Sequence, residues 1–146
     1  MNVTPFTVLL VEDDSNDALL LRRAFHRAKL TSLLQVVSDA EKAMAYLEQK
    51  PPFDKSDESP SPSLLLLDLN LPRTSGLELL EWLRKKSPPL RDLPVIILTS
   101  SRDTEDIDQA YALGANSYMA KPNGNFEGLA EMVKEFDQSG MVKRRK

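Results

Sequence analysis

The 146-residue chain has no cysteine, a single histidine and only five glycines. The absence of cysteine excludes disulfide bridges, a thiol nucleophile and every metal site that depends on thiolates. His26 has no second histidine with which to build a histidine-based zinc site. The glycines fit neither GxGxxG nor GxxxxGK[ST], so the sequence lacks the loops that cradle nucleotide phosphates.

The chain also lacks a strong charge bias and any long apolar run. A net charge of −3 and a pI of about 5.2 give no support to binding of a nucleic-acid backbone. The N-terminal segment has no basic region, and the apolar run Val8–Val11 stops at Glu12, so neither a signal peptide nor a membrane span is predicted. With 41% hydrophobic and 28% charged residues, we expect one globular domain in the cytoplasm, with no nucleic-acid or membrane partner.

Short apolar runs alternate with amphipathic segments along most of the chain. Apolar runs on both faces of a strand are typical of a buried parallel sheet. The predicted strands are 7–11, 33–37, 64–67, 95–98 and 117–120, and the predicted helices are 15–29, one after Asp39, one from Ser75, 104–113 and 125–137. This alternation predicts an α/β fold with a five-stranded parallel sheet in the flavodoxin-like order 2-1-3-4-5 and helices on both faces.

Particular side chains mark where the predicted helices begin and end. Ser15 and Asp39 are predicted N-caps, and Asp17 is an acid favoured in the first turn of a helix. Gly114 is the predicted glycine after the fourth helix. Segment 51–63 contains four prolines and is predicted to be a solvated loop at the amino edge of the sheet, opposite the candidate site; a recognition role is the alternative. The basic residues near the end of the chain, 143–146, are expected to be a solubilising tail.

Candidate site residues follow four of the five predicted strands. Glu12 and Asp13 follow the first strand and Asp68 follows the third, and these two strands are neighbours in the predicted order. At ~5 Å and an effective dielectric constant of ~20, each like-charged pair costs roughly 3 kcal/mol, so the site calls for a cation. Oxygen ligands without thiol or imidazole favour Mg²⁺.

The fourth and fifth strands add a hydroxyl and an ammonium group to this edge. Thr99 can bond an anionic oxygen, and Lys121 supplies a fixed positive charge. An anion that bridges Mg²⁺, a lysine and a hydroxyl is most naturally a phosphoryl group. Asp68 is the best-placed nucleophile. Each of these residues, considered alone, has a simpler explanation: Glu12 and Asp13 could be acids favoured at a helix start, and Asp68 could form an Asx turn. Because all of them are predicted at the same edge of the sheet, the sequence favours a phosphoryl-binding site.

Four ordered motifs resemble the receiver domain of bacterial response regulators. They are Glu12-Asp13-Asp14, Asp68-Leu-Asn70-Leu-Pro72 with Gly76, Thr99-Ser100-Ser101, and Gly114-Ala115-Asn116-Ser117-Tyr118 followed by Lys121-Pro122. The resemblance covers about residues 5 to 138, and the predicted receiver domain is 5–140 with a basic tail at 141–146. The segment from Asp68 to Arg73, with the proline-rich segment before it, further resembles stand-alone regulators paired with cyanobacterial phytochromes.

The resemblance implies a role for each motif residue. Asp68 would accept a phosphoryl group from a phosphohistidine of a sensor histidine kinase. Asp13 would bind Mg²⁺ directly, Glu12 through water and Asn70 through its main-chain carbonyl. Lys121 would pair with the phosphoryl oxygens, and its bond to Pro122 would be cis. Thr99 and Tyr118 would be the switch pair, in which the hydroxyl moves to the phosphoryl group and the ring turns inward.

The resemblance also implies a protein whose output is association rather than catalysis. No output domain is expected, so the partners would be a sensor histidine kinase, a phytochrome among the candidates, and a second copy of the chain. Tyr111, Phe126, Met132 and Phe136 are expected on or beneath the homodimer face, although some of them are also typical core residues. The alternatives are an aspartate-nucleophile phosphohydrolase and a phosphorylation-independent binding module. The first is disfavoured because Ser15 and Asn70 stand where such an enzyme has its second aspartate.

Overall fold

A five-stranded parallel sheet forms the centre of the molecule. The computed structural model describes residues 6–54, 59–100, 104–121 and 126–139. The strands lie in the order β2-β1-β3-β4-β5 and every neighbouring pair is parallel, which confirms the predicted topology. Their bounds are β1 Thr7–Val11, β2 Leu33–Val37, β3 Leu64–Leu67, β4 Val95–Thr99 and β5 Ser117–Ala120.

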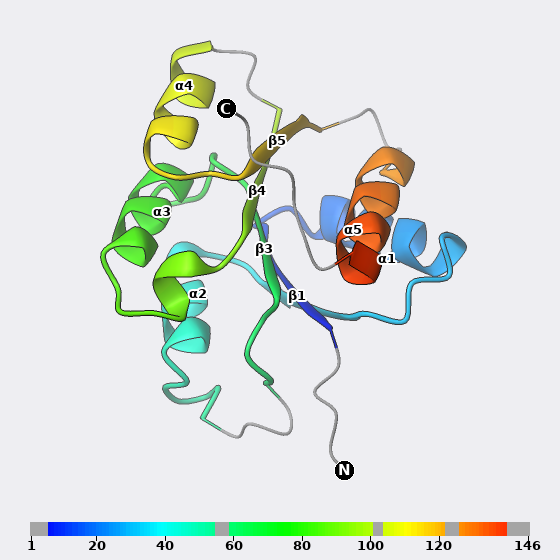
Figure 1. The fold of residues 1–146 in the computed structure, drawn as a ribbon, viewed down its shortest axis with the longest axis horizontal. Coiled ribbons are helices and arrows are strands. Elements are labelled where there is room, and N and C mark those ends of the chain that lie inside the picture. Colours follow the sequence, from blue (N-terminus) through cyan, green and yellow to red (C-terminus); the bar gives the residue numbers. More distant parts are fainter. Residues whose placement is uncertain (1–5, 55–58, 101–103, 122–125, 140–146) are drawn as a thin grey trace.

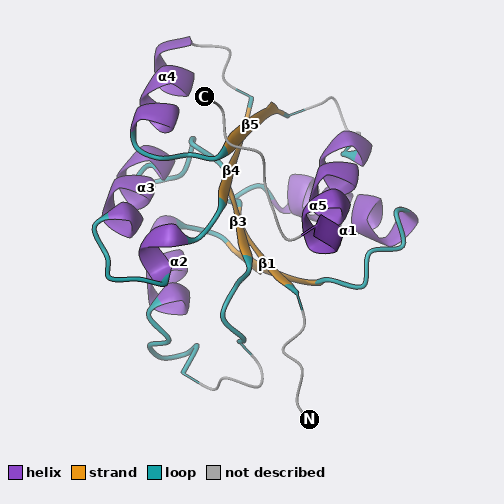
Figure 2. Cartoon of the chain, in the orientation of Figure 1, coloured by secondary structure: helices purple, strands orange, loops and turns teal. Residues whose placement is uncertain are grey.

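Helices cover both faces of the sheet (Figures 1 and 2). Helices α1 and α5 pack side by side on one face, and α2, α3 and α4 lie on the other (Figure 1). Within the described residues, no helix has the length and apolar character needed to cross a membrane. The helices are α1 Ser15–Arg27, α2 Ala40–Leu47, α3 Gly76–Arg84, α4 Thr104–Ala112 and α5 Glu127–Ser139, with a 3₁₀ turn at Leu90–Asp92.

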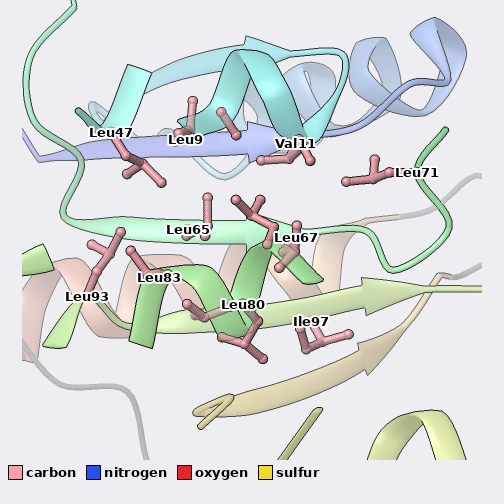
Figure 3. Packing of buried hydrophobic residues seen from close by; sticks show 14 of the residues in the cluster. Leu9, Val11, Leu47, Leu65, Leu67, Leu71, Leu80, Leu83, Leu93 and Ile97 are labelled. Carbon is pink, nitrogen blue, oxygen red and sulfur yellow. The ribbon is translucent and has the colours of Figure 1, made fainter. Parts of the chain in front are cut away.

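The central strands are apolar except for Thr7 and Thr99, because each strand supplies side chains to two cores. Leu65 and Leu67 of β3 pack under α2 and α3 (Figure 3), whereas Leu64 and Leu66 pack under α1 and α5. Successive side chains of a strand point to opposite faces, so a strand covered on both sides has no solvent face for polar residues. The run of four leucines ends at Asp68, the first residue after β3.

The structure confirms one predicted N-cap and corrects another. Asp39 accepts from the Lys42 N–H at 2.7 Å, as predicted. Ser75, the predicted start of the third helix, is the N-cap of α3 and forms a capping box with Glu78. The N-cap of α1 is Asp14 rather than Ser15, because the Asp14 carboxylate accepts from two backbone N–H groups of the first turn. Both residues are good caps in isolation, and a carboxylate is the stronger acceptor at a helix N-terminus.

Several helix ends also differ from those predicted, including that of α4, which is Ala112 rather than residue 113. Helix α1 ends at Arg27, because Lys29 adopts a left-handed conformation (φ 58°) and the Leu30 N–H donates back to the Phe25 carbonyl. Glycine usually makes this kind of ending, so the sequence gives no signal for it here. Helix α5 begins at Glu127 rather than at residue 125. Gly114 has φ 103° after α4, as predicted.

The proline-rich segment 51–63 is not a purely solvated loop in its described parts. The Tyr46 hydroxyl donates to the Pro60 carbonyl at 2.8 Å, and the Gln49 amide donates to the Ser59 carbonyl at 3.1 Å. Phe53 packs on the Tyr46 ring, and Ser59 is buried. The parts of the segment on either side of residues 55–58 therefore both contact the C-terminal end of α2. Residues 55–58 lie outside the described residues.

Aromatic residues serve mostly in packing. Phe126 and Phe136 are buried in the core under α1 and α5, and Phe136 contacts Phe6, so neither lies on a docking face. Trp82 is partly buried on α3 with the Lys86 ammonium 4.5 Å from its ring centroid. His26 is exposed on α1.

Candidate functional site

Strand register brings the acidic residues of β1 and β3 to one point. Val11 is the partner of Leu67 in the parallel ladder, so the residues that follow them, Glu12 and Asp68, emerge side by side. The Glu12 N–H donates to the Val37 carbonyl at 3.0 Å, and the Asp68 N–H donates to the Val11 carbonyl at 3.2 Å. Backbone bonds therefore hold both acids at the carboxyl edge of the sheet.

Three carboxylates at this edge form a candidate divalent-metal site. Glu12, Asp13 and Asp68 each offer an oxygen, and these oxygens all lie within 4.8 Å of one another. Glu12 and Asp68 are buried, whereas Asp13 faces solvent and leaves the site open on one side. Hard oxygen ligands around an open position suit Mg²⁺, which retains several waters when it binds to proteins. The donor set therefore fits the metal predicted from sequence.

Lys121 occupies the opposite side of the cluster. Its backbone N–H donates to the Thr99 carbonyl at 2.8 Å, immediately after β5. Its ammonium group contacts the Glu12 carboxylate and lies 3.0 Å from carboxylate oxygens of both Asp17 and Asp68. The predicted cation thus reaches the predicted nucleophile directly.

Burial and the neighbouring charges shift the pKa values of Glu12 and Lys121. Burial, together with the neighbouring Asp68, raises the pKa of Glu12 to about 7, although Lys121 opposes the shift. Burial alone would lower the pKa of Lys121, but Glu12, Asp17 and Asp68 outweigh it and raise that pKa above its usual value. A bound divalent cation would favour the ionised form of Glu12, since opposite charge stabilises a carboxylate.

Asn70 links the nucleophile to the hydroxyl of β4. Its backbone N–H donates to Asp68 Oδ1 at 2.9 Å, and its side-chain amide donates to Thr99 Oγ1 at 3.2 Å. The sequence predicted a role only for the main-chain carbonyl of Asn70. The side-chain bond was missed because nothing in the spacing of the two residues indicates it.

Thr99 and Tyr118 lie on neighbouring strands and on the same face of the sheet. Tyr118 pairs with Ile97, and both pack on the core under α2 and α3. Thr99 is two residues beyond Ile97 and therefore points to the same side. Thr99 is fully buried and Tyr118 is partly buried. The predicted switch residues are thus placed diagonally to one another.

Two further features lie near the cluster. A pocket of about 570 Å³ opens beside Glu12 and Asp13, and Pro52 and Phe53 of the proline-rich segment line the same pocket. Arg73 bonds the Asp39 carboxylate at 2.7 Å, which fastens the loop after β3 to the start of α2. Ser101, and the predicted cis bond between Lys121 and Pro122, lie outside the described residues.

Comparison with known proteins identifies a family over most of the chain. A family model for the response regulator receiver domain matches residues 8–134. The probable methanogenesis regulatory protein FilR2 of Methanothrix harundinacea is 38% identical over 134 residues, which cover 92% of this chain and 83% of that protein. The response regulator Rcp1 of Synechocystis sp. is 36% identical over 129 residues, covering 88% of this chain and 84% of Rcp1.

Solved structures show the same fold. The phosphorylated cyanobacterial phytochrome response regulator RcpA superposes with a TM-score of 0.82 at 31% identity, covering 94% of this chain and 97% of RcpA. The Mn²⁺-bound form of Rcp1 gives a TM-score of 0.77 at 33% identity, covering 97% of this chain and all of that one. A divalent metal and a phosphorylated state are thus recorded among proteins similar to this chain.

Proposed function

Because the chain belongs to the family of response regulator receiver domains, we propose that Asp68 accepts a phosphoryl group from a sensor histidine kinase in a Mg²⁺-dependent reaction. The observation that carries the proposal is the convergence of Asp68 with two further carboxylates and with the Lys121 ammonium. The proposal treats residues 5–140 as one receiver domain and residues 141–146 as a basic tail.

The residues of the chain position the reacting groups and supply the charges that stabilise the transferred phosphoryl group. One oxygen of the Asp68 carboxylate attacks phosphorus, the bond from phosphorus to the histidine nitrogen breaks, and the imidazole leaves. Lys121, 3.0 Å from Asp68, would bond the transferred oxygens, and Thr99 would offer its hydroxyl to one of them. Asp13, Asp68, the Asn70 carbonyl and, through water, Glu12 would hold Mg²⁺, which would supply charge neutralisation at the transferred group.

The relatives suggest where such a regulator works. RcpA is described as a cyanobacterial phytochrome response regulator, and a further neighbour, 35% identical with a TM-score of 0.79, as a response regulator in red light signalling of R. palustris. By analogy with these relatives, we propose that the sensor kinase that phosphorylates this chain is a phytochrome. FilR2, whose name refers to methanogenesis, favours the broader alternative of a different sensor kinase.

The proposed role is that of a switch rather than an enzyme acting on other molecules. An aspartate-nucleophile phosphohydrolase places a second aspartate two residues after its nucleophile, where it serves as general acid. The corresponding residue after Asp68 is Asn70, whose amide donates to Thr99 and whose backbone N–H donates to Asp68. An amide cannot provide a proton to a leaving group, so the phosphoryl group is expected to remain on Asp68 until water removes it.

The Asp13→Asn substitution tests the metal site. Because Asp13 adds a negative charge beside Glu12 and Asp68, we expect Asp13→Asn to unfold at a higher temperature than the parent protein without Mg²⁺. Mg²⁺ binds the native site and not the unfolded chain, so it should stabilise the parent protein clearly and the variant little. Labelling by acetyl phosphate should slow strongly in the variant at limiting Mg²⁺.

Thermal unfolding and labelling, each measured over a Mg²⁺ titration, provide the readouts for Asp13→Asn. Asp14→Asn is the matched control, because Asp14 is adjacent and exposed and asparagine is an equally good N-cap. Equal labelling of Asp13→Asn and the parent protein at limiting Mg²⁺ would refute the ligand role. Absence of any Mg²⁺-dependent labelling of the parent would refute the proposed function itself.

The proposed output is a change in association, including self-association through the face formed by α4, β5 and α5. Tyr111 and Met132 contribute partly exposed side chains from α4 and α5. Thr99→Ala should still become labelled by acetyl phosphate, since Asp68 and Lys121 remain. The shift in sedimentation on phosphorylation should shrink, because a charge-assisted hydrogen bond of about 1.5–3 kcal/mol is lost.

The Thr99→Ala experiment compares labelling stoichiometry with sedimentation for the same sample. A shift of ~5.5 kcal/mol is needed to turn a 1:99 conformational equilibrium into 99:1, which is more than one hydrogen bond supplies. Loss of the Thr99 bond should therefore weaken the association response to phosphorylation without abolishing it. A fully labelled Thr99→Ala variant that associates as strongly as the labelled parent would show that another group reads the phosphoryl group. A parent protein that stays monomeric in both states would remove the self-association proposal.

A further inference from the structure

Asp17 contacts the site but has no role in the chemistry described above. It lies in the first turn of α1, and its Oδ2 is 3.0 Å from the Lys121 ammonium nitrogen. It is not one of the three carboxylates whose oxygens gather within 4.8 Å of one another. Asp17 is therefore bound to the lysine of the site rather than to the metal position.

Three carboxylates crowd the Lys121 ammonium group. Its nitrogen donates hydrogen bonds to Asp17 and Asp68 and forms a close ion pair with Glu12. The Lys121 side chain is only 11% exposed, so little water surrounds it. A new acceptor can approach this nitrogen only if one of the present carboxylates moves away.

Phosphorylation of Asp68 introduces such acceptors. An aspartyl phosphate places three strongly accepting oxygens beside Lys121, where the unmodified Asp68 offers one. One of them can take over the bond to Asp68, and a further one can bond the ammonium group only if Glu12 or Asp17 moves away. Release of Glu12, whose side chain is 1% exposed, would take a buried carboxylate out of direct contact with the ammonium group where little water can replace it, which is costly. The Asp17 side chain is 28% exposed, so water can replace the lysine there at much lower cost.

We propose that Asp17 is a positioning residue that competes with the phosphoryl group for Lys121. The contact holds the ammonium in place in the unmodified protein and is given up when Asp68 is phosphorylated. The chemical state of Asp68 is thereby linked to the first turn of α1. This inference rests on the proposed function of Asp68 as phosphoacceptor.

Release of Asp17 leaves the helix itself intact. Asp14 caps α1 by accepting from the backbone N–H groups of Asn16 at 2.8 Å and of Asp17 at 3.3 Å. These bonds do not involve the Asp17 side chain, so both phosphorylation and an Asp17→Asn substitution should preserve the cap. The expected change is confined to the first turn, where Ala18 and Leu19 line the pocket beside Glu12 and Asp13.

The test uses the full chain with Mg²⁺ and beryllofluoride, which mimics the phosphoryl group on a carboxylate. We expect Asp17→Asn to bind beryllofluoride about fivefold more tightly than the parent protein, the factor that one partly exposed ion pair represents. Glu127→Gln removes the same charge from the first turn of α5 and should bind like the parent. In NMR spectra of the parent, backbone amide signals of Asn16 and Asp17 should shift on beryllofluoride binding, and in Asp17→Asn this shift at residue 16 should shrink.

Each result has a distinct meaning. Failure of the parent protein to bind beryllofluoride in Mg²⁺ would overturn the proposed function. Binding by the parent, with unchanged or weaker binding by Asp17→Asn, would overturn the competition while leaving the proposed function intact. If Asp17 had a purely structural role, Asp17→Asn should bind beryllofluoride more weakly than the parent protein rather than more tightly. Equal tightening in Asp17→Asn and Glu127→Gln would show a general charge effect, which would also overturn the competition.

Discussion

Replacement of Asp68 with asparagine should abolish labelling of the protein by acetyl phosphate in Mg²⁺. Asp68 provides the attacking oxygen, and an amide oxygen neither carries its charge nor forms a stable acyl phosphate. The substitution also removes one of the three gathered carboxylates and one acceptor of Lys121. Loss of labelling should therefore be complete and should not be restored by a higher concentration of Mg²⁺.

Intact-mass measurement detects the added phosphoryl group directly. Asp92→Asn is the matched control, because Asp92 is exposed in the 3₁₀ turn before β4 and should label like the parent protein. Mapping of the label by borohydride reduction should then place it on Asp68. Undiminished labelling of Asp68→Asn would mean that another carboxylate is the acceptor, with Asp13 the first to examine.

The sheet and the members of the site could be predicted from sequence because both follow from burial. Strands covered on two sides must be apolar, so the first polar residue after each run marks the carboxyl edge of the sheet. Glu12, Asp68 and Lys121 were located in this way, and the structure brings them together. Thr99 proved to be the last residue of β4 rather than the residue after it, and its pairing with Ala120 places Lys121 beside it.

The interactions that depend on side-chain direction could not be predicted. In the sequence, Asp17 is only an acid in the first turn of a helix, a position that the helix dipole favours in any case. Its bond to Lys121 joins residues 104 positions apart, and only the packing of α1 against the sheet brings them together. The bond from Asn70 to Thr99 depends likewise on the course of the loop after β3.

The loop after β3 also explains why glycine stands at position 76. The Gly76 N–H donates to the Leu69 carbonyl at 3.1 Å, so the start of α3 lies directly against the backbone that carries Asp68. A Cβ at this position would lie 2.4 Å from the Asp68 carbonyl oxygen and 2.7 Å from the Leu69 Cα. Both neighbours are backbone atoms, so a larger residue must displace the loop itself.

We therefore expect Gly76→Ala to lower the free energy of unfolding by about 1–3 kcal/mol, the usual cost of overpacking, and to slow labelling of Asp68 at the same time. Gly128→Ala on α5 is the matched control, because a Cβ there meets nothing within 4 Å. Alanine has the higher helix propensity, so Gly128→Ala should raise stability by up to about 1 kcal/mol and leave labelling unchanged. Urea unfolding followed by circular dichroism, with acetyl phosphate labelling of the same samples, measures both quantities. If Gly76→Ala instead matches Gly128→Ala in stability and rate, the close approach of α3 does not hold Asp68 in position.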